Sequence, residues 1–400
     1  MKKTKLHNLF STQGLRFSLL AVTLVALIIF PDQSYGQSQP AYVARDVSAY
    51  NKLNLKQGST PEIWEDGIRT GGVKGTYEWW YFDTHLDDGS TMVIIFFTKP
   101  FTQINKGLSP VAAVSIKKPG GITIESVYYG EPEDFSASEE KCDVVIGKNS
   151  FRGNLQHYKI HFEDEDLNLD VDIQRETESW RPQTGYFYYG DKGDYFAWVV
   201  AVPHGHAKVN YTYKGESVSA GGSCYHDHNW GNKNMADLMN HWYWSRAQIG
   251  PYTVIAAELI GEKDYNNSSV VVFNLSKYGK TVVDDGNNVR LLRSYGKIQT
   301  IGKKPLSDEL MFIYECEDEE YAYVYTLTKE KNIEETKILN KISRMPKIQK
   351  MLIEFFTGFD GAYYRMVGTA NLKVYKNGRL VEEYTNTEAI WELMFFGKVI

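Results

Sequence analysis

The segment 225–231 concentrates side chains that can transfer protons, hydrogen-bond a substrate or stabilise positive charge. It reads, in order, Tyr225, His226, Asp227, His228, Asn229, Trp230 and Gly231. A carboxylate beside an imidazole can hold one tautomer and raise the basicity of the ring, so Asp227 is expected to orient His228. The face of an indole attracts positive charge, which suits Trp230 to a cationic transition state. The pattern therefore predicts proton transfer at a carbon centre or a leaving oxygen, with His226 or His228 as the carrier.

An extended backbone would divide this segment between two faces, because successive side chains of a strand point to opposite sides. The two faces would carry, respectively, Tyr225, Asp227 and Asn229, and His226, His228 and Trp230. Two other interpretations stay open. The His-x-His pair could bind zinc with Asp227 or His241 as a third ligand, although the chain has no HExxH motif. The cluster could also be a polar turn that only forms hydrogen bonds at a domain interface.

Two glutamates stand among apolar residues, where burial would raise their pKa values. Glu78 precedes Trp79 and Trp80, and Glu258 interrupts the apolar run 254–260. A desolvated carboxyl group keeps its proton to higher pH and can act as a general acid. We therefore expect Glu78 or Glu258 to be the partner acid or base at the substrate oxygen. The alternative is a solvated glutamate on an exposed strand face.

The segment 241–246 alternates aromatic and polar residues, as a strand that lines a pocket would. Its last residue, Arg246, could hold a substrate carboxylate through two hydrogen bonds. Substrate contacts are predicted for Trp230, Trp80, Tyr225, Asn229, Tyr243 and Arg246. The chain has no glycine-rich phosphate loop, dinucleotide fingerprint or GxSxG motif, so ATP, NAD and serine-hydrolase chemistry have no support.

Short alternating runs separated by turn residues predict an all-β chain built from antiparallel sheets. Runs 77–83 and 91–97 flank a turn at 87–90, and runs 158–162 and 167–173 flank an acidic turn. The run 195–202 is expected to end at Pro203, since proline cannot donate to a sheet. That ending would place His204, Gly205 and His206 in a loop. One helical insertion is predicted at 334–356, interrupted by Pro346, because its apolar residues recur at helical spacing.

The order of apolar, polar and strand-like segments along the chain suggests a division into four parts. After a signal peptide at 1–36, a polar lead-in segment at 37–70 precedes an N-terminal β domain at 71–235 and a C-terminal β domain at 236–400. This division would place the segment 225–231 beside a domain interface, where pockets often form.

The N-terminus has the features of a cleaved export signal. Lys2, Lys3, Lys5 and Arg16 precede the apolar run 17–30, and Ser34 and Gly36 are small residues at the cleavage positions. We therefore expect a periplasmic or secreted protein without stable membrane insertion after signal cleavage.

Charge and cysteine content limit the function classes further. The chain has a net charge of −6, and loss of its basic N-terminus would make it more acidic, which argues against nucleic acid as a partner. Cys142, Cys224 and Cys316 are too few and too far apart for a disulfide framework or a CxxC metal site.

Several motifs together resemble the carotenoid 1,2-hydratase (hydroxyneurosporene synthase) family, with its AttH-like and Diels–Alderase-type relatives. The resemblance spans most of residues 70–396 and rests on Glu78–Phe82, Pro203 with the residues after it, Tyr225–Gly231, Tyr363–Arg365 and Ala389–Glu392. It implies two lipocalin-like antiparallel β-barrel or sandwich domains, with a pocket between or within them. It also implies chemistry on a carbon–carbon double bond without a metal or an organic cofactor.

The same resemblance implies roles for a histidine and a tryptophan at His228 and Trp230. A Tyr-x-Asp pair that the family uses in the next strand corresponds here to Ala256, Ala257 and Glu258, so an acid is kept and the tyrosine is lost.

These observations predict a cofactor-independent hydro-lyase that adds or removes water. The favoured substrate is an unsaturated, uronate-containing oligosaccharide from polysaccharide breakdown, because an exported, aromatic-rich pocket suits sugars and Arg246 suits a carboxylate. The alternatives are a hydratase or cyclase of an isoprenoid or polyketide alkene, and a non-catalytic lipocalin-like carrier. An apolar tunnel instead of a sugar-sized groove would favour the alkene.

Overall fold

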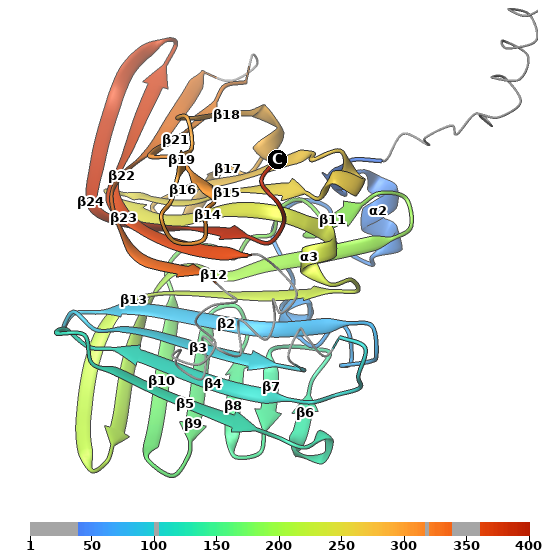
Figure 1. The fold of residues 1–400 in the computed structure, drawn as a ribbon, viewed down its shortest axis with the longest axis vertical. Helices are drawn as coiled ribbons and strands as arrows, with labels where there is room; N and C mark the ends of the chain where they lie inside the picture. The colour runs from blue at the N-terminus through green and yellow to red at the C-terminus, as the bar shows by residue number, and fades with distance from the viewer. Residues whose placement is uncertain (1–38, 100–103, 317–319, 338–360) are drawn as a thin grey trace, which may run out of the picture. The chain divides into compact units, whose positions relative to one another are not determined.

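The computed structural model describes residues 39–99, 104–316, 320–337 and 361–400. The predicted signal peptide at 1–36 lies outside the described residues. The described part is built almost entirely of antiparallel strands that curl into two sheets, and Figure 1 shows them one above the other.

Within the described residues, the first sheet has 13 strands in the order β5-β4-β3-β2-β13-β12-β10-β9-β8-β7-β6, with β11 paired to β12 and β1 paired to β11. The bounds of its strands are β1 Ala41–Val43, β2 Tyr77–Leu86, β3 Thr91–Phe97, β4 Val111–Lys117, β5 Thr123–Tyr129, β6 Phe135–Ala137, β7 Asp143–Ile146, β8 Asn149–Gly153, β9 His157–Glu163, β10 Leu167–Arg175, β11 Tyr186–Tyr189, β12 Asp194–Tyr213 and β13 Glu216–Gly231.

The second sheet has nine strands in the described residues, in the order β17-β16-β15-β14-β24-β23-β22-β21-β18. Its strands, with the separate pair β19 and β20, are β14 Met239–Ile249, β15 Tyr252–Gly261, β16 Ser269–Lys277, β17 Lys280–Val283, β18 Val289–Arg293, β19 Lys297–Ile298, β20 Pro305–Leu306, β21 Glu309–Tyr314, β22 Tyr321–Lys337, β23 Ala362–Lys376 and β24 Arg379–Phe395.

Helices are short in the described residues, and none is long and apolar enough to cross a membrane. They are α2 Val47–Lys52, α3 Met235–Leu238 and the 3-10 turns η1 Ile63–Asp66, η3 Pro132–Asp134, η4 Lys263–Tyr265 and η5 Gly286–Asn288. The predicted lead-in segment therefore contains β1, α2 and η1.

The predicted hairpins form as expected from their turns. Strands β2 and β3 pair in register from Trp79 with Phe97 to His85 with Thr91. At the turn, Gly89 has a positive φ of 82°, and Asp88 accepts a hydrogen bond from the backbone of Ser90 at 2.8 Å. Glycine tolerates this backbone conformation without steric cost, which explains why the turn lies there.

Two predictions of local structure are wrong. Strand β12 does not end at Pro203 but runs through it, so His204, Gly205 and His206 lie in a strand and not in a loop. Register shifts between Val200 and Val202 and between Val202 and Gly205 accommodate the proline, because a bulge needs no ladder hydrogen bond there.

The second error concerns the predicted helix at 334–356. Residues 334–337 continue strand β22, where Glu334 pairs with Arg365 of β23, so the helix does not begin at Glu334. The remainder of the predicted helix, including Pro346, lies outside the described residues.

In the described residues, three large apolar clusters fill the two sheets and the space between them, beside a small cluster around Trp230. The first fills the curl of the N-terminal sheet and includes Phe82 and Ile94; the second fills the C-terminal sheet and includes Phe273 and Leu372. The third lies between the sheets, where Trp198 of β12 and Leu259 of β15 belong to one cluster. Since residues 39–400 form one compact unit, the division into two domains at residue 235 stays a prediction.

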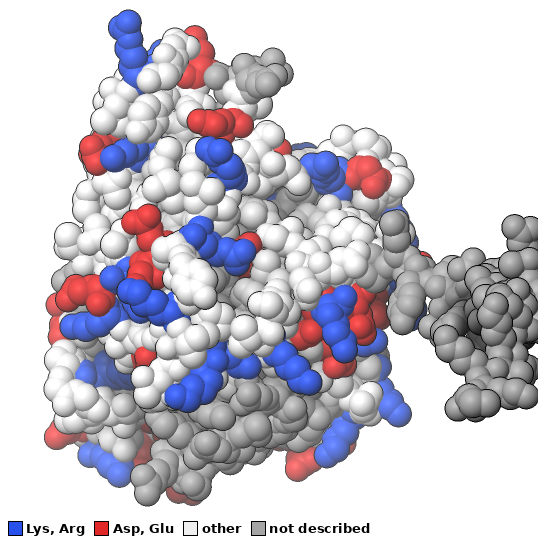
Figure 2. All heavy atoms as spheres, turned by 45° about the horizontal axis from the view of Figure 1, so that its top comes forward, with Lys and Arg blue, Asp and Glu red and all other residues white. Residues whose placement is uncertain are grey.

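Charged side chains are distributed over the surface without a single dominant sign on the face seen in Figure 2. There, lysine and arginine lie interspersed with aspartate and glutamate.

Candidate active site

The predicted alternation of side chains in segment 225–231 is confirmed. Strand β13 pairs with β2 on one side and β12 on the other, so its backbone is held in the middle of the first sheet. Tyr225, Asp227 and Asn229 face a cavity between the two sheets. The other face, with His226 and His228, points into the interior of the first sheet, where both imidazoles are fully buried.

The cavity on the first face has a volume of about 170 Å³ and mostly aromatic walls. Indoles line it from β2, β12 and β14, namely Trp79, Trp198, Trp242 and Trp244. Tyr81 and Phe196 add two further rings, while Ala257 and Leu259 of β15 close the side formed by the second sheet. Such a surface suits a flat or unsaturated apolar group and stabilises positive charge that develops beside the rings.

Asp227 is the carboxylate of β13 at this cavity. One of its oxygens accepts hydrogen bonds from Trp198 Nε1 at 2.9 Å and from the Tyr225 hydroxyl at 2.8 Å, and the other accepts from Asn229 Nδ2 at 2.8 Å. Burial raises the pKa of Asp227 to about 6, although these hydrogen bonds favour the ionised form. A carboxyl group with this pKa can both give and take a proton near neutral pH.

A smaller cavity of about 110 Å³ adjoins the aromatic one and shares Trp244 and Glu392 with it. Its walls are charged. Arg246 pairs with both oxygens of Asp83, and its guanidinium lies 5.6 Å from the ring centre of Tyr225. Arg365 Nε lies 3.8 Å from Glu392 and is buried without a hydrogen-bond partner among the described residues.

Burial, together with the charge of Arg246, lowers the pKa of His85 in this smaller cavity to about 4. His85 is therefore neutral at physiological pH, and the two arginines are the cations of this compartment.

On the opposite face of β13, His228 is paired with Glu78 and not with Asp227, so the expected orienting contact is absent. His228 Nε2 lies 2.8 Å from Glu78, whose carboxylate also accepts from the backbone of Arg69 and from Thr70. Trp80 stacks on the imidazole with ring centres 4.6 Å apart. The reason is geometric: neighbouring residues of a strand point to opposite faces.

Two other predicted residues belong to this closed face. Trp230 lies against the His228 ring at 4.8 Å and donates to the Tyr186 hydroxyl at 3.2 Å. His226 contacts the backbone carbonyl of Tyr81 at 2.8 Å and the carboxylate of Asp66 at 3.3 Å. The closed face therefore holds one packed group of side chains, and none of them lines the aromatic cavity. The group consists of His226, His228, Glu78, Trp80 and Trp230.

Glu258 and Tyr243 lie in the second sheet and do not join β13. Glu258 accepts from Ser269 at 2.7 Å and pairs with Arg293 at 3.0 Å, and burial raises its pKa as expected. The Tyr243 hydroxyl accepts a backbone hydrogen bond from Ser307 at 3.1 Å. Glu258 alternates along β15 with Ala257 and Leu259, which face the cavity, so β15 turns Glu258 away from it.

The zinc site considered from sequence does not assemble either. His241 stacks on Phe395 at 4.6 Å, and Asp227 lies on the face of β13 opposite to His226 and His228. A different group, Asp66, Cys142 and His226, brings one ligand atom each to within 4.8 Å of one another.

Several residues of the site were missed from sequence. Trp79 and Tyr81 alternate with Glu78 and Trp80 along β2, so the 2-residue period of the strand could have assigned them to the cavity. Trp198 and Asp66 carried no such signal, because their proximity to β13 depends on which strands and turns pack together.

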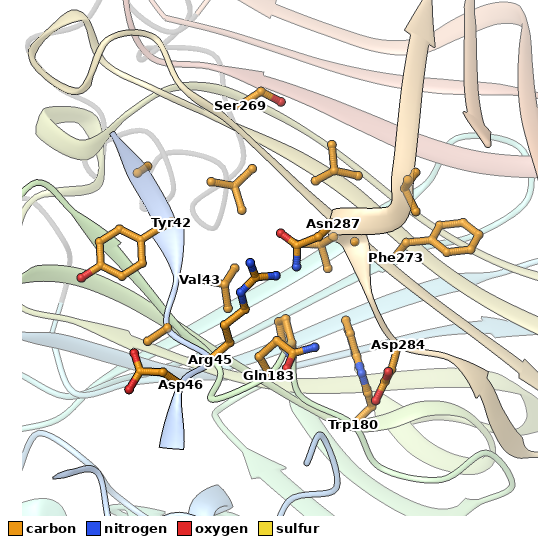
Figure 3. A pocket seen from close by; sticks show the side chains of 18 residues that line it. Tyr42, Val43, Arg45, Asp46, Trp180, Gln183, Ser269, Phe273, Asp284 and Asn287 are labelled. Atoms are coloured by element: carbon orange, nitrogen blue, oxygen red, sulfur yellow. The ribbon is translucent and has the colours of Figure 1, made fainter. Parts of the chain in front are cut away.

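A larger cavity, of about 580 Å³, opens where β1 approaches β16 (Figure 3). Arg45 extends into it, toward Asn287. Its walls offer two carboxylates, Asp46 and Asp284, but no histidine, and Asp46 is occupied in capping α2.

Comparison with known proteins gives the family. A family model described as Diels-Alderase-like matches residues 73–289, which is more than half of the chain. The chain belongs to the Diels-Alderase-like family. The fold agrees: this Diels-Alderase-like chain aligns with an AttH protein from Nitrosomonas europaea at a TM-score of 0.54 and 14% identity, over 89% of this chain and 100% of the other. It aligns with CghA at 0.54 and 13% identity, over 86% and 97%.

The alignments with sequence relatives cover less of this Diels-Alderase-like chain. It is 24% identical over 235 residues to hydroxyneurosporene dehydrogenase of Chlorobaculum tepidum, over 48% of this chain and 58% of that protein. It is 30% identical over 67 residues to the quinolone epoxide rearrangement protein PenF of Penicillium thymicola, over 16% and 18%. The chain thus matches less than two-thirds of either relative's length. The resemblance to the hydroxyneurosporene and AttH-like proteins and the lipocalin-like two-sheet fold are confirmed, and the Chlorobaculum tepidum relative is named as an enzyme.

Proposed function

We propose that the protein is a hydro-lyase that adds water to, or removes water from, an unsaturated and mostly apolar organic substrate bound between the two sheets. The observation that carries this proposal is Asp227, a carboxyl group with a pKa of about 6 in an aromatic cavity. Membership of the Diels-Alderase-like family and the hydroxyneurosporene relative support an enzyme acting on such a substrate.

Asp227 supplies and recovers the proton. In the direction of hydration, its protonated form gives the proton to one alkene carbon, and the adjacent carbon becomes cationic. The indoles of Trp198, Trp79 and Trp244 line the same cavity and stabilise that cation by the negative potential of their ring faces. Water then adds to the cation, and the proton it loses returns to the Asp227 carboxylate. The reverse sequence eliminates water.

The hydrogen bonds to Asp227 fix the orientation of its carboxyl group, and with it the side from which the proton can be transferred. Trp198, Tyr225 and Asn229 donate to the carboxylate and hold its plane fixed. Fixed donors of this kind need no rearrangement when the carboxylate forms, and they stabilise it after proton transfer.

The adjoining charged cavity suits a polar end of the substrate. The Nε atom of Arg365 is buried and lacks a hydrogen-bond partner among the described residues, and Arg246 lies beside it in the same cavity. A carboxylate, enolate or carbonyl oxygen placed there would satisfy Arg365 and fix the position of the double bond relative to Asp227.

The shape and lining of the site favour an isoprenoid- or polyketide-like alkene over the oligosaccharide expected from sequence. A sugar unit presents hydroxyl groups on all sides, and each one buried without a partner costs about 1–3 kcal/mol. Indole and phenyl rings dominate a cavity of about 170 Å³ and offer few partners. A uronate remains compatible only with the arginine compartment. The predicted export signal would place the reaction in the periplasm or outside the cell.

The test is mass spectrometry of the purified protein incubated with two substrate sets, acyclic isoprenoids with a polar end and unsaturated uronic oligosaccharides. Gain or loss of one water in the isoprenoid set, abolished by Asp227→Asn, is the expected result. The same change in the oligosaccharide set alone would contradict the substrate class proposed here. Binding without any mass change in either set would contradict catalysis and favour a carrier.

A further inference from the structure

Three ligand-type side chains meet inside the first sheet, away from the aromatic cavity. Asp66 ends the turn η1, Cys142 directly precedes β7, and His226 lies in the middle of β13. Their ligand atoms lie within 4.8 Å of one another, and each residue is at most 1% exposed. A thiol, an imidazole and a carboxylate at this spacing are the donor types that bind zinc.

The hydrogen bonds of His226 fix which of its nitrogens faces Asp66 as an acceptor. Nδ1 lies 2.8 Å from the backbone carbonyl of Tyr81, and a carbonyl can only accept, so Nδ1 carries a proton. In the neutral ring, Nε2 then presents a lone pair to Asp66 Oδ2 at 3.3 Å. Two acceptors face each other unless a proton or a metal cation lies between them.

His228 repeats this arrangement on the other oxygen of Asp66. Its Nε2 points at Glu78, which already accepts three other hydrogen bonds and therefore acts as an acceptor here as well. His228 Nδ1 lies 3.6 Å from Asp66 Oδ1, and both atoms are buried without a hydrogen-bond partner among the described residues. The Asp66 carboxylate of the group of three therefore keeps one oxygen without a hydrogen-bond partner among the described residues.

This pattern is typical of metal ligands. A metal-bound imidazole usually donates its other N–H to a carbonyl or carboxylate, as His226 does to Tyr81 and His228 to Glu78. The Tyr158 hydroxyl donates to Asp66 Oδ2 at 2.5 Å, which leaves Oδ1 as the ligand oxygen.

We propose that Asp66, Cys142 and His226 bind one zinc-class divalent cation that ties η1 and the start of β7 to β13. Sulfur and imidazole ligands select such an ion over magnesium or calcium, which require oxygen ligands. All three ligand side chains are buried, so the ion is structural. It holds the strand whose opposite face carries Asp227, and it stands independently of the proposed reaction.

Cys224 offers a matched control for Cys142. It is also a fully buried, free cysteine, it contributes to the same apolar cluster of the first sheet, and it lies outside the ligand group. Replacing either cysteine by serine removes the same atoms from a similar environment. Only Cys142→Ser should affect metal binding.

The experiment measures zinc in the purified full chain by mass spectrometry after gel filtration, and the visible spectrum after Co²⁺ replaces it. We expect one zinc per chain and a thiolate-to-cobalt charge-transfer band in the wild type and in Cys224→Ser. In Cys142→Ser the band should be absent and the metal affinity at least roughly 10–100-fold lower. Zinc well below one per chain with no cobalt band in the wild type would overturn the proposal, as would equal affinity in the two serine variants.

If Cys142→Ser does not fold, Asp66→Asn answers the same question. The amide keeps an acceptor for Tyr158 but lacks the anionic ligand oxygen. A folded Asp66→Asn chain with unreduced zinc content and affinity would contradict the proposal, and loss of the metal would support it.

Discussion

The two faces of strand β13 carry similar polar side chains and differ in what surrounds them. On one face, His226 and His228 are 0% exposed, and one ring nitrogen of each contacts a fixed partner. On the other face, Asp227 is 8% exposed and borders a cavity of about 170 Å³. A substrate can reach only the second face. Residue types alone therefore indicate that β13 is the functional strand, whereas the packing on each face decides which of its residues can meet a substrate.

Electrostatics reinforce this difference. Burial raises the pKa of Asp227 to about 6 and leaves it able to change charge near neutral pH. Glu78, on the closed face, accepts hydrogen bonds from Arg69, Thr70 and His228, which hold it in place. The open face therefore suits proton transfer, and the closed face suits structural support.

The largest expected effect concerns Asp227 itself. Asp227→Asn removes the transferable proton, and we expect turnover to fall by about 10²–10⁴-fold while the chain stays folded. Turnover is measured from the mass change of the substrate, with folding checked by thermal melting.

Glu258→Gln is the control for that variant, because it makes the same chemical change at a buried carboxylate that faces the interior of the second sheet. It should leave turnover per folded molecule close to that of the wild type. Equal losses in the two variants would show that the cavity face has no special role.

The second prediction concerns stability. His228→Ala leaves the Glu78 carboxylate buried without its imidazole partner and removes the ring that stacks on Trp80. Leaving a buried carboxylate without a hydrogen-bond partner costs about 1–3 kcal/mol of unfolding free energy or more, and loss of the stacked ring adds to it; urea denaturation measures the total. A loss below about 1 kcal/mol would mean that the closed face is not structural.

The third prediction uses pH to separate Asp227 from other groups. Its pKa is raised on folding from 3.8 to about 6, so the folded state binds the proton more tightly. Its contribution to stability is then full below pH 3.8 and is lost as pH rises through 6. A shift of about 2 pKa units corresponds to roughly 3 kcal/mol.

Asp227→Asn lacks this titration and isolates it. The unfolding free energy of the wild type, minus that of the variant, should fall by roughly 2.4 kcal/mol between pH 4 and pH 7. Urea denaturation at the two pH values measures it. A constant difference would refute the raised pKa.

The smallest expected effect concerns the polar end of the substrate. Arg365→Gln should raise KM about tenfold with little change in kcat, because a hydrogen bond to a charged group contributes about 1.5–3 kcal/mol. Lys373→Gln, an exposed cation on the same strand paired with Glu383, is the control and should leave KM unchanged. A loss in kcat alone would place Arg365 in the chemistry and not in binding.

Much of the fold could be predicted from local pattern. The hairpin of β2 and β3 follows from period-2 alternation around the turn at Gly89, and the two faces of segment 225–231 follow from the same period. Pro203 misled the prediction because a bulge, set by the pairing of β12 with β13, absorbs it.

The site could be predicted only in part, since its partners come from distant segments. Asp227 meets Trp198, and His226 meets Asp66, contacts that depend on strand order and on the packing of η1. Glu258 shows the converse case, because its apolar surroundings did predict a raised pKa but not which side of β15 faces the cavity. Sequence period assigns a residue to a face, and only the tertiary structure shows what that face meets.

The pH dependence of kcat/KM, measured in the wild type and in His228→Gln, tests the central claim most directly. This quantity reports the titration of essential groups in the free enzyme. If protonated Asp227 is the acid, kcat/KM falls in both proteins as pH rises through about 6. A wild-type profile with no fall in this range would contradict proton transfer by Asp227. A fall that disappears in His228→Gln would assign the proton transfer to the closed face of β13 instead.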